Sequence, residues 1–167
     1  MKNGTLGFCF SLISVFLVSC TDGFSSESPS NKLEYYARHA VTLTEVLGKY
    51  LEFKSFILII HKENCSHCLN AEPLLQKYLN SDSPEVYCLN TTSQKDLAST
   101  DFYSQIVACY LSQTEYTENQ KLFDSKNPKV FAPSLISIKN GHPNFVLIGL
   151  PAADAGVRLN RLIQMNK

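Results

Sequence analysis

The residues from Phe56 to Cys68, FILIIHKENCSHC, join an apolar run to a pair of cysteines. Residues 56–60 are continuously apolar and have the length of a β-strand, which is typical of a central strand covered on both faces. A short polar turn from His61 to Asn64 follows, and Cys65 comes directly after it. The stretch therefore predicts a buried strand, a turn and a helix that begins at a Cys-x-x-Cys pair.

Apolar residues behind the cysteine pair recur at helical spacing. They occupy positions i, i+3, i+4, i+7 and i+8, which predicts an amphipathic helix ending near Asn80. The members of this stripe are Ala71, Leu74, Leu75, Tyr78 and Leu79. Cys65 would lie at the helix N-terminus, where free backbone N–H groups and the helix dipole favour a thiolate over a thiol. Cys68, one turn later, would serve as the resolving thiol.

The rest of the chain alternates between helical and strand patterns. Thr44 is predicted to cap a short helix that continues to about Leu51, and residues 86–89 form a short strand. A second helical face carries Phe102, Ile106, Cys109 and Tyr110, and the polar residues 112–127 are predicted to be partly helical.

The C-terminal part predicts a hairpin followed by a helix. Residues 135–138 and 145–148 read as two strands joined across Asn140-Gly141, the strongest short hairpin signal. Leu159, Leu162 and Ile163 then form the apolar face of a closing helix. Strands interleaved with helices and followed by an antiparallel hairpin predict a mixed-sheet α/β domain.

The charge balance and the number of cysteines exclude some classes of protein. The chain has 15 Lys+Arg against 15 Asp+Glu and no basic cluster, which argues against a nucleic-acid partner. Its 6 cysteines are too few for a small disulfide-stapled scaffold, so chemically special cysteines are favoured over structural ones.

From about residue 41 to 166 the sequence resembles the thioredoxin family. The shared features are the strand, the Cys65–Cys68 pair, Pro73 five residues later, and Ala132-Pro133-Ser134-Leu135, which is similar to the family's cis-proline loop. Lys139-Asn140-Gly141 and Gly149 continue the match in order. The resemblance implies a thioredoxin fold, a mixed central sheet flanked by helices, with a helical insertion before the cis-proline strand. It also implies that Cys65, Cys68, His67 and Pro133 are catalytic and that Ala132 and Pro133 shape a substrate groove.

His67 gives the centre the form Cys-x-His-Cys, which resembles periplasmic disulfide oxidases. A protonated His67 beside the Cys65 sulfur would favour the thiolate, and stabilising the reduced form makes a disulfide more oxidising. The alternative is a solvent-facing histidine without a role. His67 therefore favours oxidation, whereas many tethered thioredoxin-like proteins are reductases.

Three features depart from the thioredoxin pattern. The buried acid that thioredoxins carry six positions before the first cysteine is Ile59 here, and the chain has no Trp, so that His61 and Asn64 replace the flanking aromatic residues. The chain between Cys68 and Pro133 is also longer, with the surplus after Asn90. General-base duty would fall to His61, Glu63, His67 or water, each side chain being otherwise a plain surface residue.

The remaining two cysteines of the domain, Cys88 and Cys109, are expected to pack as small buried hydrophobes. A second disulfide between them is an open alternative. A zinc site would need about four ligands, and no second ligand pair has recognisable spacing. Copper binding by the thiolates and a histidine remains a further alternative. We therefore expect no metal and no cofactor beyond the redox-active disulfide.

The N-terminus reads as an export signal. Lys2 precedes the apolar residues 8–18, which are too short to span a bilayer that needs roughly 20 residues. Residues 17–20, ending in Cys20, resemble the lipobox of bacterial lipoproteins, whose cysteine is acylated; an ordinary signal with a chance cysteine is the alternative. We predict a signal peptide at 1–19 that contains Cys9, the acylated Cys20 with a flexible tether at 20–32, and a thioredoxin-like domain at 33–167.

These features predict an extracytoplasmic thiol-disulfide oxidoreductase, lipid-anchored in a bacterial cell envelope. Its partners would be cysteine-containing exported proteins and a membrane redox partner. The alternative is a non-catalytic thioredoxin-fold lipoprotein that binds a secretion partner or a metal ion. The layout of strand, cysteine pair and Pro133 also resembles accessory thioredoxin-like proteins of bacteriocin export.

Overall fold

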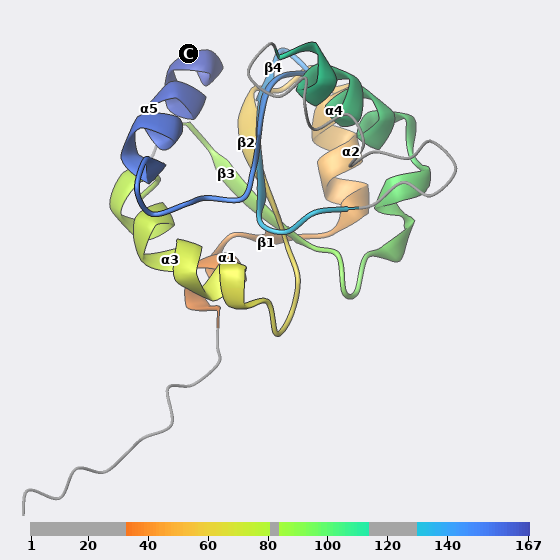
Figure 1. Ribbon diagram of the computed structural model, residues 1–167. Coiled ribbons are helices and arrows are strands. Elements are labelled where there is room, and N and C mark those ends of the chain that lie inside the picture. The colour runs from red at the N-terminus through yellow and green to blue at the C-terminus, as the bar shows by residue number, and fades with distance from the viewer. Residues whose placement is uncertain (1–32, 81–83, 114–129) are drawn as a thin grey trace, which may run out of the picture. The chain divides into compact units, whose positions relative to one another are not determined.

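The computed structural model describes residues 33–80, 84–113 and 130–167 (Figure 1). The predicted signal peptide, Cys20 and the tether lie outside the described residues, as does most of the polar stretch 112–127. The strands are β1 (Ala40–Val41), β2 (Phe56–His61), β3 (Val86–Asn90), β4 (Ser134–Lys139) and β5 (His142–Ile148). The helices are α1 (Glu34–Arg38), α2 (Leu43–Leu51), α3 (Ser66–Tyr78), α4 (Asp101–Ser112) and α5 (Ala155–Asn166), with a 3₁₀ helix at Lys95–Ser99.

The strands form one five-stranded mixed sheet in the order β1-β3-β2-β4-β5. β3 is parallel to both β1 and β2, whereas β4 runs antiparallel to β2 and β5 antiparallel to β4. Residues 56–60 of β2 are buried, as their continuous apolar run predicts, and His61 at the end of the strand is buried as well. With the cysteine pair at the start of the helix after β2, this topology is the thioredoxin fold, which confirms the predicted fold class.

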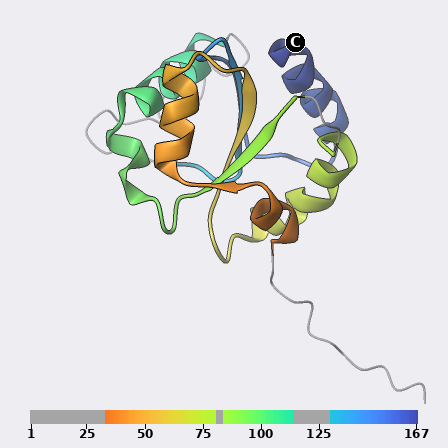
Figure 2. The ribbon, with the colours of Figure 1, turned by 180° about the vertical axis from the view of Figure 1, so that it is seen from behind.

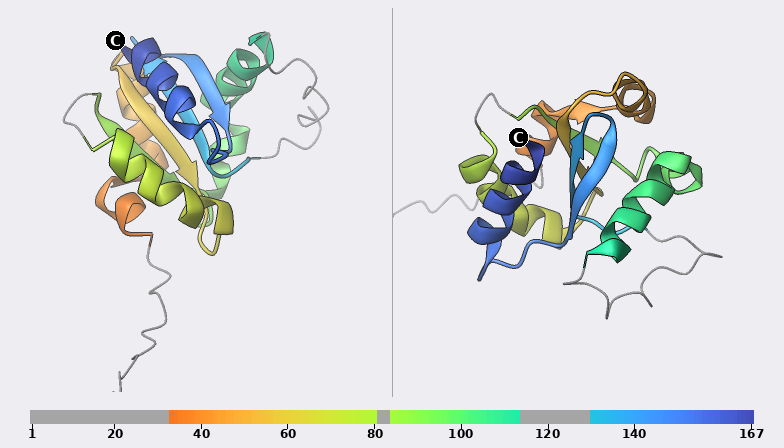
Figure 3. Two further views of the ribbon diagram at one scale, coloured as in Figure 1. Left: turned by 60° about the vertical axis from the view of Figure 1, so that its left-hand side comes forward. Right: turned by 90° about the horizontal axis from the view of Figure 1, so that it is seen from above.

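Helices cover both faces of the sheet, and the alternation of side chains along β2 divides the core into two layers. Ile57 and Ile59 pack with residues of α1, α3 and α5. Phe56, Leu58 and Ile60 pack with residues of α2 and α4. Figures 1 and 2 show the two helical layers from opposite sides, and the right panel of Figure 3 shows the sheet edge-on between them.

The start of the domain differs from the prediction. The short elements α1 and β1 were not predicted, because five helical and two extended residues carry no readable periodicity. The predicted cap Thr44 is wrong: α2 begins at Leu43 and is capped by Thr42. Thr42 and Glu45 form a capping box, in which Glu45 N donates to Thr42 Oγ1 (3.3 Å) and Thr42 N donates to Glu45 Oε2 (2.7 Å).

The β4–β5 hairpin is confirmed. Asn140 and Gly141 take positive φ angles of 50° and 75°, as a tight hairpin turn requires. A Cβ atom at residue 141 would lie 2.7 Å from the carbonyl oxygen of Tyr50, so glycine is also needed for the close approach to α2.

In the described part of the chain, no helix is long and apolar enough to span a bilayer.

Candidate functional site

The cysteine pair stands where β2 passes into α3. Cys65 is the N-cap of α3 and Cys68 lies in its first turn, and the two form a disulfide with a Cα–Cα separation of 5.2 Å. The amide of Cys68 donates to Cys65 Sγ (3.1 Å) and to the Cys65 carbonyl oxygen (3.0 Å). Cys65 is half-buried and Cys68 is fully buried, so an incoming sulfur has access to Cys65 and not to Cys68.

The local electrostatics favour a thiolate at Cys65 once the disulfide is reduced. The Cys65 sulfur accepts a backbone N–H at the positive end of a helix that extends over Ser66–Tyr78. The first turn of α3 carries no acidic residue that would oppose a negative sulfur. A helix N-terminus stabilises a thiolate over a thiol, and the thiolate is the form that attacks or leaves in thiol-disulfide exchange.

The loop before β4 faces the cysteine pair. The Ala132–Pro133 peptide bond is cis, and Cys65 Sγ lies 3.6 Å from the carbonyl oxygen of Ala132. The oxidised sulfur carries no proton, so this is a packing contact that a reduced thiol would turn into a hydrogen bond. Gly149 N donates to Pro133 O (2.8 Å), which ties the end of β5 to the same loop.

A groove of about 460 Å³ runs along this loop. Its lining is mostly apolar and includes Ala132, Pro133 and the segment 148–152. His67 and Asn70 line it from α3, and both side chains are exposed. The fold therefore brings the predicted residues His67, Ala132 and Pro133 into one groove and places Cys65 beside Ala132.

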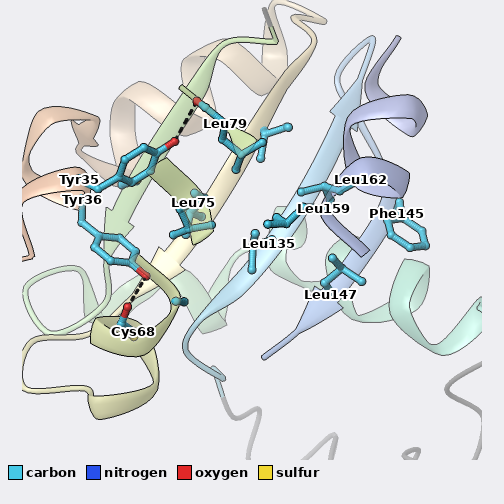
Figure 4. Packing of buried hydrophobic residues seen from close by; sticks show 14 residues of the cluster. Tyr35, Tyr36, Cys68, Leu75, Leu79, Leu135, Phe145, Leu147, Leu159 and Leu162 are labelled. Carbon is cyan, nitrogen blue, oxygen red and sulfur yellow. Dashed lines mark hydrogen bonds between the residues drawn. The ribbon is translucent and has the colours of Figure 1, made fainter. Parts of the chain in front are cut away.

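The short helix α1 is fixed to α3 behind the disulfide. Tyr36 Oη donates to the carbonyl oxygen of Cys68 (2.9 Å), and Tyr35 Oη donates to that of Leu79 (3.2 Å), as the dashed lines in Figure 4 show. The amide of Tyr35 donates to the Glu72 carboxylate. Both tyrosines are almost completely buried, so α1 covers the inner face of the helix that carries the cysteines.

Glu72 is a buried carboxylate that the sequence analysis missed. Ile59, at the position of the usual buried acid, lies in the apolar core cluster with Cys68. Glu72 lies one turn after Cys68 and is only 9% exposed. Burial raises the pKa of Cys88, and the Glu72 charge raises it further. The spacing from Cys68 to Glu72 and Leu75, i, i+4 and i+7, was the available signal that Glu72 faces inward.

The two candidate bases before Cys65 differ in environment. The expectation that His61 lies at the surface is wrong. His61 is 6% exposed, and its ring packs on the ring of Tyr36 with 4.5 Å between the centroids. Burial lowers the pKa of His61 to about 4, against the opposing effect of the Glu63 charge, so the imidazole is neutral near pH 7. Glu63 is exposed, and its carboxylate accepts a hydrogen bond from Asn90 Nδ2 (2.9 Å).

Cys88 and Cys109 are free thiols, so the structure does not contain the second disulfide that was left open. Cys88 is buried as expected, whereas Cys109 is only half-buried. Burial raises the pKa of both thiols, which makes them poor nucleophiles. Within residues 33–80, 84–113 and 130–167, no group of three or more His, Cys, Asp or Glu side chains is placed to hold a metal ion.

The fold and the cysteine pair define a thioredoxin-fold protein with a Cys-x-x-Cys centre at disulfide distance. Solved structures with similar folds include a point-mutant thioredoxin from Halobacterium salinarum, at 12% identity and a TM-score of 0.49, covering 77% of this chain and 89% of its own. Mitochondrial thioredoxin 3 from Saccharomyces cerevisiae matches at 16% identity and a TM-score of 0.46, with coverages of 77% and 96%. The thioredoxin pre-protein of Schistosoma mansoni matches at 14% identity and a TM-score of 0.46, covering 74% of this chain and 96% of its own.

No protein-family model matches the sequence, and the search of curated proteins found no match. The fold assignment rests on the strand order and the position of the cysteine pair. It does not rest on the solved structures, whose similarity is low.

Proposed function

We propose that this protein is a thiol-disulfide oxidoreductase that acts on cysteines of exported proteins. The observation that carries the proposal is the asymmetry of the pair: half-buried Cys65 caps α3, and its disulfide partner Cys68 is completely buried. The Cys65 sulfur is accessible to a substrate, whereas the Cys68 sulfur can reach only Cys65. Exchange through a mixed disulfide requires one accessible sulfur and one resolving sulfur of this kind.

In the reducing direction, the Cys65 thiolate attacks one sulfur of a substrate disulfide and the other substrate sulfur leaves as a thiolate. Cys68, after losing its proton, attacks Cys65 Sγ, re-forms the Cys65–Cys68 disulfide and releases the second substrate thiolate. Two electrons pass from the protein to the substrate. The oxidising direction is the reverse: a substrate thiolate attacks Cys65 Sγ and Cys68 leaves as a thiolate. A second substrate thiolate then attacks the substrate sulfur of the mixed disulfide, so that the substrate disulfide forms, Cys65 leaves as a thiolate, and two electrons pass to the protein.

The groove beside Ala132 and Pro133 is proposed to hold the substrate segment during exchange. The Ala132 carbonyl oxygen lies 3.6 Å from Cys65 Sγ, so a chain placed along this loop would have its own sulfur close to Cys65. His67 lines the groove from the α3 side and is exposed to whatever binds there. Its proposed role is to favour the Cys65 thiolate and thereby the oxidising direction.

Insulin reduction and oxidation of a reduced, unfolded protein test the activity. Cys65→Ser is expected to abolish both, and Cys68→Ser is expected to accumulate a mixed disulfide that can be trapped and identified. Cys109→Ser is the matched control and should retain activity. If neither Cys65→Ser nor Cys68→Ser changes turnover, the non-catalytic alternative, a binding module on the same fold, replaces the proposal.

Equilibration of the Cys65–Cys68 disulfide with glutathione decides the direction. A potential well above that of thioredoxin is expected for an oxidase, and His67→Pro should lower it towards thioredoxin's. A wild-type potential as reducing as thioredoxin's would replace the oxidase with a reductase.

The proposed location is the outer side of a bacterial membrane, with a lipid anchor at Cys20. The support is the apolar run 8–18 and the lipobox-like residues ending in Cys20. Expression in a bacterium with a labelled fatty acid should label the wild type and the Cys9→Ser variant, but not Cys20→Ser. Labelling that survives Cys20→Ser would exclude this anchor.

A further inference from the structure

A second cavity lies on the α1 side of the segment that leads into Cys65. Its volume is about 310 Å³, at the lower end of cavities that bind small molecules. Leu33, Tyr36 and Ala37 line it from the start of the domain and α1, and His61 and Asn90 line it from the ends of β2 and β3. None of its lining residues is shared with the groove beside Pro133, so it is a separate site.

One part of the cavity wall is apolar, and the single charged lining residue is acidic. The aliphatic side chains of Leu33, Ala37 and Ala40 and the ring of Tyr36 form the apolar part, and Glu63 contributes the charge. Asn90 Nδ2 donates to one carboxylate oxygen of Glu63 (2.9 Å), and Glu63 N donates to Thr92 Oγ1 (3.0 Å). These bonds hold Glu63 in place and leave its second carboxylate oxygen available to a further donor.

No cation in the described part of the protein neutralises Glu63. Among the described side chains, no Lys, Arg or His nitrogen lies within ion-pair distance of its carboxylate. His61, which also lines the cavity, is neutral near pH 7 because its burial lowers its pKa to about 4. The cavity therefore has a net negative charge that its own lining does not balance.

His61 lines the cavity, and one of its ring nitrogens is buried without a hydrogen-bond partner among the described residues. The side chain is 6% exposed, and the nitrogen without a partner is Nδ1. Buried polar atoms without a partner are rare in folded proteins and often mark a place where a ligand or water belongs.

We propose that this cavity, the Glu63 pocket, receives a lysine or arginine side chain from the segment of a client protein that flanks its reacting cysteine. Long basic side chains bury their aliphatic stems against apolar walls while the charged end meets a carboxylate. Because Asn64 also lines the pocket and directly precedes Cys65, a side chain bound there belongs to a chain that passes close to the reactive sulfur. The inference rests on the proposed function and adds a substrate preference to it.

The kinetic test uses the reduced protein and peptides that carry one cysteine as a thionitrobenzoate mixed disulfide. The peptides differ only in having arginine, glutamine or glutamate around the cysteine, and release of the thionitrobenzoate reports attack by Cys65. We expect the arginine peptide to react about fivefold faster than the glutamine peptide, the upper range for a partly exposed ion pair. Glu63→Gln should remove this preference, whereas Glu52→Gln, an exposed acid at the end of α2, should retain it.

The Ala37→Leu variant distinguishes binding inside the Glu63 pocket from a general electrostatic attraction to the Glu63 charge. Residue 37 is exposed on α1, so a larger side chain there fills the pocket without removing any charge. The arginine preference should disappear in Ala37→Leu although Glu63 is intact. Equal rates for the three peptides with the wild type, or a full preference in Ala37→Leu, would overturn the proposal.

A binding measurement keeps this inference independent of catalysis. N-acetylargininamide added to the oxidised protein should shift the NMR signals of Ala37, His61 and Glu63, and N-acetylglutaminamide should not. The shifts should be lost in Ala37→Leu. Shifts without thiol exchange on any peptide would leave the pocket standing and refute the oxidoreductase, whereas exchange without these shifts and without an arginine preference would refute the pocket alone.

Discussion

The hydroxyl of Tyr36 donates a 2.9 Å hydrogen bond to the carbonyl oxygen of Cys68 and so links α1 to the first turn of α3. Tyr36 is completely buried and its ring also packs on His61, at the end of β2. One side chain from the start of the domain therefore contacts residues on both sides of Cys65. Tyr36 thus links the end of β2 to the first turn of α3, on either side of the Cys65 position.

Tyr36→Phe should lower the free energy of unfolding by about 1 kcal/mol, the usual contribution of one hydrogen bond. It should also shift the equilibrium of the Cys65–Cys68 disulfide with glutathione, because the lost bond ends on Cys68. Tyr35→Phe is the control, since its hydroxyl bonds to Leu79 at the far end of α3. Urea denaturation and glutathione equilibration measure the two effects. An equal redox shift in both variants would assign the effect to α3 as a whole.

Glu72 should matter for stability through its hydrogen bond to the Tyr35 amide. Glu72→Ala leaves this buried donor without a partner, which costs about 1–3 kcal/mol. Glu72→Gln retains an acceptor oxygen and should be affected much less. Urea denaturation of both variants checks the prediction, and similar losses in both would mean that the carboxylate charge, not the hydrogen bond, stabilises α1 on α3.

Three cysteines of the domain, Cys65, Cys109 and Cys88, should react with iodoacetamide in a fixed order after reduction. Cys65 should be modified first because it is half-buried at a helix N-terminus. Cys109 should follow slowly, and Cys88 should be modified last, because complete burial shields its sulfur and raises its pKa. Timed alkylation at pH 8 with mass spectrometry gives the order. Rapid native-state modification of Cys88 would show that the β3 face of the core opens.

His61 should make the protein less stable in mild acid. Its folded-state pKa of about 4 lies below the ordinary 6.5, so the unfolded chain binds the proton more readily between these values. Stability is therefore expected to fall as the pH drops from about 6.5 to 4, by about 3 kcal/mol for the full shift. The charged neighbour that opposes this effect is Glu63.

Urea titrations of the wild type and His61→Phe between pH 4 and 7 measure this effect. The His61→Phe variant should show a shallower pH dependence, and His142→Gln, at an exposed histidine in the β5 strand, should retain the wild-type slope. A wild-type slope that persists in His61→Phe would assign the acid sensitivity to other groups.

Much of this architecture was predictable from local patterns. The buried run 56–60, the amphipathic stripe behind Cys68 and the Asn140-Gly141 turn each have a period or a backbone requirement that few alternatives satisfy. The same logic placed Cys65 at a helix N-terminus. The boundary of α2 was missed because the capping box depends on Thr42 and Glu45 together, not on the last threonine before the apolar residues.

Sequence alone therefore determined which cysteines form the pair and where it lies in the fold, because strand burial and helix capping are encoded by neighbouring residues. Only the tertiary structure decided what surrounds the pair. α1 packs on α3 through Tyr36 and Glu72, Ala132 lies beside Cys65, and His61 is buried with Glu63 close by. These contacts join residues that are far apart in the chain or that look solvent-exposed in isolation. Their burial depends on how the layers close, which no local periodicity specifies.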